Sequence, residues 1–472
     1  MMSASKQASP NVASNSGEHL EKDLTLATRS QTSFSSRVPG FYKWSIDQRM
    51  QWLQDSFRLS SEQVKGLRQD HLQSHTDQHQ LLSIERADKM VENCVGLFSL
   101  PVGLGLNFSI NHKDYVIPMV VEEPSVIAAV SHIARLARNS GGFVANSDAS
   151  IMIAQIQLVE CPNLPQAAHA LEAAHDQLVQ IADQIHPNLR ARGGGVQGFD
   201  VRVFDGDYPM LVLHCRVDCI DAMGANAVNT IAEGIAPEIE RITGGKVYLR
   251  ILSNLADQRL ARAQVKIAES DLNLYRNNEL IMTGAEVAQG VIYAYQFADI
   301  DPYRAATHNK GIMNGIDAVV IATGNDWRGV EAGAHAYAAQ SGRYRSLTKF
   351  WRDDGYLFGS IELPMAVATV GGSTQVHPTV KTLRQVLNVD GAQELAQVCA
   401  AVGLAQNLGA LKALATEGIQ RGHMSLHSRS VALAVGAEAH EVDRLAQALI
   451  DLGQVKADVA SDLLKNMRLA TK

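Results

Sequence analysis

The chain has 472 residues, of which 46% are hydrophobic and 19% charged, a balance typical of a soluble globular protein. This length exceeds what one hydrophobic core usually holds, so two or three structural units are expected. The formal net charge of −7 excludes a general basic field that would attract nucleic acid or an anionic membrane, so neither is expected as a partner.

Cysteine content and the start of the chain favour a cytoplasmic location. Residues 1–6 lack the basic region and apolar core of a secretory signal, and no apolar run approaches the roughly 20 residues that cross a bilayer. The odd number of scattered cysteines fits a reduced chain. Cys215 and Cys219 would face one side of a strand, where we expect burial and not zinc, because no second pair has ligand spacing. No metal is therefore predicted.

The N-terminal part contains a tail followed by helices. Residues 1–35 hold eleven Ser or Thr and little apolar periodicity, so they are expected to be disordered. Helices are predicted over Ser45–Phe57 and Ser61–His71, with Ser45 and Ser61 as N-caps. Turn residues at Asn111–Asp114 then predict a β-hairpin.

A helix is predicted after Pro124, because apolar residues recur at helical spacing from Val126 to Ala137. The composition then changes. Residues 149–254 follow the order strand, helix, strand, strand, helix, strand, which is the split βαβ pattern. This order predicts an inserted ferredoxin-like domain.

Residues 255–417 are expected to return to the first unit, with a strand at Ala318–Ala322 and Lys310 on a turn before it. Helices are predicted around Gly329–Gln340 and Gln393–Leu414. The predicted fold class is therefore α+β. A large mixed domain (36–148 and 255–417) carries the small inserted domain (149–254), and a helical segment (418–472) follows.

Four motifs supply groups that handle protons. They are Glu-Glu-Pro-Ser-Val-Ile-Ala-Ala at 122–129, Asn-Lys-Gly-Ile-Met-Asn-Gly-Ile-Asp at 309–317, Gly-Asn-Asp at 324–326 and Gly-His-Met at 422–424. Together they provide two carboxylates, an ammonium and an imidazole beside glycine or proline. This set is typical of a reductive or acyl-transfer active site.

In order and spacing, the four motifs resemble those of class II 3-hydroxy-3-methylglutaryl-CoA (HMG-CoA) reductases, from about Ser36 to the C-terminus. The resemblance implies reductive deacylation of HMG-CoA to mevalonate and coenzyme A with two NAD(P)H, through mevaldyl-CoA and mevaldehyde, or the reverse oxidation. It also implies that 149–254 binds the nicotinamide cofactor and that 418–472 is a mobile flap. Family members form homodimers, or larger assemblies of dimers, with active sites across the subunit interface.

The same resemblance assigns the catalytic roles. Lys310 would stabilise the oxyanion, Asp326 would bridge Lys310 and a carboxylic acid, and His423 would protonate the CoA thiolate. The family motif selects Glu123 as the acid, although position alone does not separate it from Glu122. Chemistry alone leaves His427 as an alternative to His423.

Binding roles are also carried over from the family motifs. Arg37 is predicted near the CoA phosphates, where pairing with a nearby carboxylate is an equally good alternative. The predicted substrate-carboxylate group is Arg304, Ser125 and Asn314. The predicted cofactor signature is Asp221, Met223, Gly224 and Asn226. Arg190 and Arg192 favour NADPH over NADH, because an arginine there suits a 2′-phosphate.

Two other functions compete with this prediction. A CoA-thioester hydrolase or transferase with Cys-His chemistry is disfavoured, because no cysteine adjoins the Lys310, Asp326 or His423 motifs. A catalytically inactive CoA-binding scaffold is disfavoured because all four chemical groups are present.

Overall fold

The computed structural model describes residues 34–68, 82–416 and 418–469. Residues from Ser36 onward form one compact unit. The predicted disordered tail lies outside the described residues up to residue 33, as do the last residues of the helix predicted over Ser61–His71.

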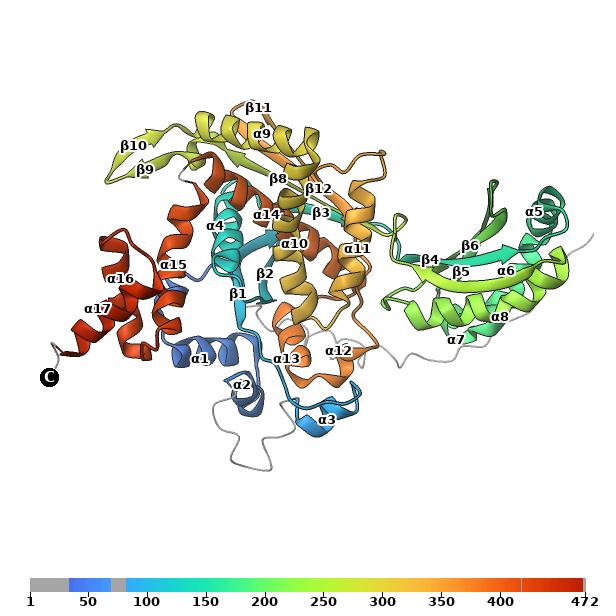
Figure 1. Ribbon diagram of the computed structural model, residues 1–472, viewed down its shortest axis with the longest axis horizontal. Helices are drawn as coiled ribbons and strands as arrows, with labels where there is room; N and C mark the ends of the chain where they lie inside the picture. Colours follow the sequence, from blue (N-terminus) through green and yellow to red (C-terminus); the bar gives the residue numbers. More distant parts are fainter. Residues whose placement is uncertain (1–33, 69–81, 417, 470–472) are drawn as a thin grey trace, which may run out of the picture. The chain divides into compact units, whose positions relative to one another are not determined.

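The large unit contains a mixed six-stranded sheet with strand order β11-β12-β8-β3-β1-β2 (Figure 1). All neighbouring pairs are antiparallel except β1 and β3. Its strands are β1 (Val102–Ile110), β2 (Lys113–Val120), β3 (Phe143–Ser147), β8 (Leu260–Ala268), β11 (Thr348–Asp353) and β12 (Tyr356–Pro364). The predicted hairpin is confirmed, since Asn111 and His112 both have positive φ between β1 and β2, which is typical of a two-residue turn.

Helices bury the apolar residues of this sheet in one core. They are α4 (Val126–Arg138), α9 (Gly284–Ile300), α10 (Pro302–Ala322), α11 (Trp327–Ala338), α13 (Pro378–Leu387) and α14 (Ala392–Ala415), whereas the short α12 (Ser373–Val376) contributes no described side chain to this core. The 24-residue α14 is long and apolar enough to cross a membrane, contrary to the expectation of no such run. Its most apolar window is 67% buried, and it packs against α10, α9 and β3, as expected of a core helix.

A second sheet of four antiparallel strands has the order β5-β6-β4-β7 and its own hydrophobic core. Along the chain its elements are β4 (Ile151–Val159), α5 (Leu164–Ala173), α6 (His175–Ile185), α7 (Pro187–Ala191), β5 (Gly195–Phe204), β6 (Met210–Asp218), α8 (Ala225–Thr243) and β7 (Lys246–Ser253). The predicted helix over 166–185 is interrupted at Ala174. We call these residues the small unit.

Shorter elements complete the described chain. They are η1 (Phe41–Lys43), α1 (Ile46–Phe57), α2 (Ser61–Arg68), α3 (Ile84–Asp88), η3 (Glu269–Leu272), β9 (Leu274–Arg276), β10 (Glu279–Met282), α15 (Ile419–Ala434), α16 (Ala439–Asp451) and α17 (Ala457–Leu469). Ser45 caps α1 with a capping box, as predicted. The cap of α2 is Ser60 and not Ser61, because the Ser60 hydroxyl accepts the Gln63 N–H.

The strand predicted at Ala318–Ala322 is wrong, and so is the turn predicted at Lys310. Both lie in the continuous helix α10, which Asp301 caps and Pro302 begins. The β-branched residues near its end suggested a strand, yet Ile312, Ile316, Val319 and Val320 are buried on one helical stripe. The predicted α+β class is confirmed.

Candidate active site

Lys310 and Asn314 converge on one carboxylate. The Lys310 ammonium donates to Glu123 Oε2 at 2.7 Å, and the Asn314 amide donates to the same oxygen at 3.1 Å. Lys310 and Asn314 are one turn apart on α10, so their side chains share a helical face. The structure therefore brings together three predicted site residues from two motifs that are far apart in the sequence.

The turn before α4 places Glu123. Pro124 and Ser125 form this turn, and Ser125 begins the helix at φ 74°, a conformation that is uncommon for a non-glycine residue. The Ser125 hydroxyl does not cap α4, and its oxygen is buried without a hydrogen-bond partner among the described residues. A polar ligand group would satisfy that oxygen.

The pair remains accessible to a ligand. The Lys310 side chain is 61% exposed and the Glu123 side chain 35%. Lys310 therefore keeps donor capacity beyond the bond to Glu123. Glu122, the alternative acid, is exposed, and Lys310 pairs with Glu123.

Asp326 is the N-cap of α11, where its carboxylate accepts the Gly329 N–H at 3.1 Å. Within the described chain it makes no hydrogen bond or ion pair with Lys310 or Glu123, so the predicted bridge is not formed here. It follows a helix and not the strand that the apolar run suggested. Its catalytic role stays a prediction.

The predicted thiolate acid lies on α15. His423 belongs to this helix, but its side chain is outside the described side chains. His427, one turn later, is exposed. Gly418 precedes α15 with φ 79°, a conformation that favours glycine.

The two predicted arginines for the substrate lie in different settings. Arg304 lies in the first turns of α10, half-buried, and burial lowers its pKa from the ordinary arginine value. It makes no hydrogen bond or ion pair with another described residue, so its donors remain available. Arg37 is exposed.

The predicted cofactor residues surround the start of α8 in the small unit. Gly224 is the N-cap with φ 100°, and a Cβ there would lie 2.2 Å from Cys219 Sγ, so no larger residue fits. Met223 is half-buried and Asn226 is exposed in the first turn. The Asp221 carboxylate accepts the Ala392 N–H at 2.9 Å, which engages one of its oxygens with the start of α14.

Arg192 lines a cleft of about 200 Å³ beside this helix start, together with Ala149, Ser150, Gly193, Asp218, Ile220, Asp221 and Gln393. Arg190 is directed to Asp183, with Nε 3.4 Å from Oδ2. The two arginines predicted for one role therefore differ, because only Arg192 lines the cleft.

Sequence reasoning missed Arg259. This guanidinium is buried and donates to the carbonyl oxygens of Ala222 and Met223 at 3.2 and 3.3 Å. It also donates to the Val367 carbonyl of the large unit at 2.5 Å. Arg259 thus holds the turn before α8 against the large unit. No periodicity or motif around Arg259 would have revealed this contact.

Cys215 and Cys219 are buried, as expected, and burial raises the pKa of the Cys219 thiol to about 12. Among the described residues, no group of three or more His, Cys, Asp or Glu side chains is arranged to hold a metal ion.

Comparison with known proteins defines the class of enzyme. The family model described as hydroxymethylglutaryl-coenzyme A reductase matches residues 45–428. The 3-hydroxy-3-methylglutaryl-coenzyme A reductase of Archaeoglobus fulgidus is 48% identical over 438 residues, which are 92% of this chain and 96% of that protein. A probable reductase of the same name from Borreliella burgdorferi is 33% identical and covers 80% of this chain and 87% of its own.

Solved structures similar to this chain belong to the same class of enzyme. The 3-hydroxy-3-methylglutaryl-coenzyme A reductase of Streptococcus pneumoniae has a TM-score of 0.75 and 40% identity, over 91% of this chain and 99% of its own. A class II structure of that organism's enzyme, bound to NADPH in open conformations, has a TM-score of 0.74 at 40% identity, over 90% of this chain and 100% of its own. The protein is thus an oxidoreductase. It belongs to the hydroxymethylglutaryl-coenzyme A reductase family, whose function is the reduction of HMG-CoA to mevalonate.

Proposed function

We propose that this chain reduces HMG-CoA to mevalonate and coenzyme A with two equivalents of NADPH, through mevaldyl-CoA and mevaldehyde. The reverse oxidation uses the same groups. The observation that carries the proposal is the convergence of Lys310 and Asn314 on Glu123. Reduction of a thioester requires a cation for the developing oxyanion and an acid for the alkoxide, and this site provides both.

Each residue has a distinct task. Lys310 donates to the substrate carbonyl oxygen as negative charge develops there. Glu123 gives a proton to the aldehyde oxygen in the second reduction, and Asp326 tunes the proton positions of this pair, as the family resemblance implies. His423, or alternatively His427, protonates the CoA thiolate when α15 approaches the bound ligand.

Substrate recognition is assigned to two arginines and two smaller polar side chains. Arg304 is suited to the carboxylate of the HMG moiety, because its half-buried guanidinium makes no hydrogen bond or ion pair with another described residue. We assign the buried Ser125 hydroxyl and the Asn314 amide to the same substrate carboxylate. Arg37 is assigned to the CoA phosphates, where an exposed arginine is accessible to them.

NADPH is favoured over NADH, and it supplies the hydride in each reduction. The residues that suit it are those at the start of α8. No described side chain caps that helix start, so its first backbone N–H groups suit a pyrophosphate, with Asp221, Met223 and Asn226 around them. Arg192, on the adjacent cleft, would pair with the 2′-phosphate, with Arg190 nearby. The class II relative from S. pneumoniae that binds NADPH supports this choice.

The domain boundaries that we propose are supported by the strand order of the small unit and by a separate core near the C-terminus. The strand order β7-β4-β6-β5 with α8 on one face supports a ferredoxin-like cofactor domain at 149–254 inserted into the large domain. Residues 418–472 have their own small hydrophobic core, which supports a flap that moves as a body after Gly418.

A homodimer, or a larger assembly of dimers, is proposed from the segment around Val95. Residues 94–101 form neither helix nor strand, and Val95 is 100% exposed and Phe98 90%. An apolar segment of this kind is stabilised when a second copy covers it. The family resemblance implies that the active site of such a dimer lies across the subunit interface.

We assign the enzyme to the cytoplasm. The buried position of α14 and the five free cysteines support that assignment. The proposed direction is reduction.

The decisive experiment measures NADPH oxidation by the purified protein with and without HMG-CoA, with mevalonate and free thiol quantified as products. The expected stoichiometry is two NADPH oxidised per mevalonate and per CoA released. Thiol release without NADPH oxidation would favour the hydrolase instead, and HMG-CoA binding without turnover would favour the inactive scaffold.

A further inference from the structure

The Arg259 guanidinium is buried without an ionic partner in the part of the chain that the structure describes. The residue is 4% exposed, and its hydrogen bonds all go to main-chain carbonyl oxygens, those of Ala222, Met223 and Val367. An arginine keeps its proton in a protein, so Arg259 carries a positive charge out of water. Burial of such a charge is costly unless an anion compensates it.

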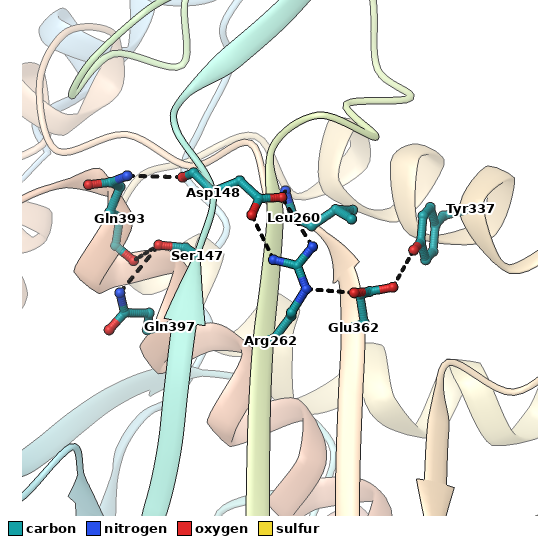
Figure 2. Close-up of polar contacts among 8 residues, drawn as sticks. All are labelled: Ser147, Asp148, Leu260, Arg262, Tyr337, Glu362, Gln393 and Gln397. Atoms are coloured by element: carbon teal, nitrogen blue, oxygen red, sulfur yellow. Dashed lines mark hydrogen bonds and ion pairs between the residues drawn. The ribbon is translucent and has the colours of Figure 1, made fainter.

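Two carboxylates near the start of β8 pair with a different arginine. Arg262 donates to both oxygens of Asp148, at 2.7 and 3.2 Å, and to Glu362 at 2.6 Å (Figure 2). Asp148 also accepts the N–H of Leu260, the residue that follows Arg259, at 3.3 Å. Both carboxylates therefore balance Arg262, and the charge of Arg259 is left without either of them.

Two further carboxylates near Arg259 belong to the cleft beside the cofactor turn. Burial lowers the pKa of the Arg259 guanidinium, and the charges of Asp218 and Asp221 act in the opposite direction without an ion pair. Among the residues that line the cleft, the charged ones are these two aspartates and Arg192. A pyrophosphate that enters the cleft therefore needs more positive charge than Arg192 alone provides.

Arg259 lies close behind this cleft. It lines a smaller cavity of about 10 Å³ together with Ser150 and Gln393, and both of these residues also line the larger cleft. The smaller cavity has about the volume of one water molecule, so little more than single side chains separates the guanidinium from the cleft. A charge acts more strongly through such protein interior than through water.

The hydrogen bonds of Arg259 also orient the turn before α8. Its guanidinium binds the carbonyl oxygens of Ala222 and Met223, and in a trans peptide the N–H points opposite to the C=O. The N–H of Gly224, in the same peptide as the Met223 carbonyl, therefore points away from Arg259. This N–H and those of the first two residues of α8 make no hydrogen bond with another described residue, so they can bind an anion.

We propose that Arg259 is a positioning residue for the pyrophosphate of NADPH, whose negative charge compensates the buried guanidinium through the turn at 222–224. This inference rests on the proposed cofactor role of the small unit and adds the source of its positive charge. Arg259 binds the peptides of the turn from one side, and the pyrophosphate binds their N–H groups from the other. The arginine and the turn belong to one chain, so the effect is the same whichever subunit binds HMG-CoA.

The test measures calorimetric binding of two unreactive probes to the full-length protein. 2′-Phospho-ADP-ribose contains both the pyrophosphate and the 2′-phosphate of NADPH, whereas 2′-AMP contains the 2′-phosphate alone. Arg259→Gln keeps a donor for the carbonyl oxygens and removes the charge. The dissociation constant of 2′-phospho-ADP-ribose should rise about 10- to 100-fold and that of 2′-AMP less than about twofold, because only the first probe places a charge at the turn. Equal changes for the two probes, or no change for either, would overturn the proposal.

Arg259→Lys separates the charge from the hydrogen bonds. At pH 6 this variant should bind 2′-phospho-ADP-ribose more tightly than Arg259→Gln does, because lysine restores a cation. A buried lysine loses its proton more readily than an arginine, so the advantage should decline as the pH rises to 9. A purely structural role would not produce this dependence. If Arg259→Lys binds no more tightly than Arg259→Gln at any pH in this range, the charge has no role.

Arg352→Gln is the matched control for the loss of one positive charge. Arg352 lies on β11, its side chain is 34% exposed, and its charge is balanced by Glu269. Both probes should bind to this variant as they do to the wild type. A weakening of 2′-phospho-ADP-ribose binding as large as in Arg259→Gln would assign the effect to net charge and contradict the proposal.

If Arg259→Gln does not fold, the pH dependence of Arg259→Lys against the wild type decides the question, since the wild type should not lose affinity between pH 6 and pH 9 through this residue. Failure of the proposed function gives a different result. The wild type itself would then bind neither probe, which would overturn the cofactor assignment and this inference with it.

Discussion

Lys310 and Glu123 form an ion pair of 2.7 Å between α10 and the turn that precedes α4. The two residues are 187 positions apart, and Asn314 binds the same carboxylate oxygen. Because the pair is partly exposed, a carbonyl oxygen that enters the site meets a cation and an acid together. The first two predictions test these two groups separately.

Lys310→Ala should reduce kcat at least about 100-fold, since removal of one oxyanion donor typically costs that much. HMG-CoA binding should be partly retained, because Arg304 and Ser125 are unchanged. The measurement is steady-state NADPH oxidation together with calorimetric HMG-CoA binding. Near-normal turnover in Lys310→Ala would show that the oxyanion role is wrongly assigned.

Glu123→Gln keeps a side-chain acceptor for Lys310 and Asn314 but removes the proton that the acid delivers. Reduction of added mevaldehyde should therefore fall about 10²- to 10⁴-fold, the usual contribution of a general acid. Glu122→Gln, one residue away and exposed, is the control and should behave like the wild type. The reverse result would identify Glu122 as the acid.

Much of this site could be predicted from the sequence because its groups lie in long motifs with distinctive turn residues. Lys310 and Glu123 were found through those motifs, and the structure brings them together. Local structure was harder to predict. The β-branched run at the end of α10 suggested a strand, because a short apolar run does not separate a buried helix from a buried strand.

Other contacts had no sequence signal. Arg259 and Arg262 are single arginines in a segment without a motif, and their partners are backbone carbonyls or carboxylates distant in sequence. At Asp326 the sequence does give a signal, but that signal fits two different roles. A carboxylate before a helix can cap that helix or act on a ligand, and the sequence pattern is the same for both.

Arg192→Ala should raise KM for NADPH about tenfold or more and leave KM for NADH nearly unchanged. A charge-assisted hydrogen bond to the 2′-phosphate contributes about 1.5–3 kcal/mol, and NADH lacks that phosphate. Arg190→Ala is the comparison, because Arg190 already pairs with Asp183. Initial rates at varied cofactor concentration give the KM for NADPH and the KM for NADH of each variant. Equal effects on the two cofactors would remove Arg192 from phosphate recognition.

Phe98→Ser should weaken self-association, because it removes an exposed apolar side chain from the segment proposed to contact a second copy. Sedimentation velocity over a range of protein concentrations measures the dimer fraction. Tyr208→Ser is the matched control, since Tyr208 is 84% exposed on the hairpin between β5 and β6. If both variants dimerise as the wild type does, the segment is not the interface.

Asp317→Asn should change how stability depends on pH. Burial first, and the facing Glu331 second, raise the pKa of the Asp317 carboxyl from 3.8 to about 8. The folded state thus holds a proton that the unfolded state releases above pH 3.8. The stabilisation from this group is therefore complete below pH 3.8 and is lost as pH rises towards 8. This loss follows from the difference in the number of bound protons between the folded and unfolded states.

Asparagine has nearly the same shape as a protonated aspartate but does not titrate, so the variant lacks this loss. Its free energy of unfolding, measured in urea between pH 5 and pH 9, should exceed that of the wild type increasingly towards alkaline pH. Carboxylates that do not face Asp317 titrate alike in both proteins, so the difference between the two curves isolates the Asp317–Glu331 pair. Parallel curves across this range would mean that Asp317 is ionised in the folded protein, and that α10 tolerates two facing charges beside Glu331.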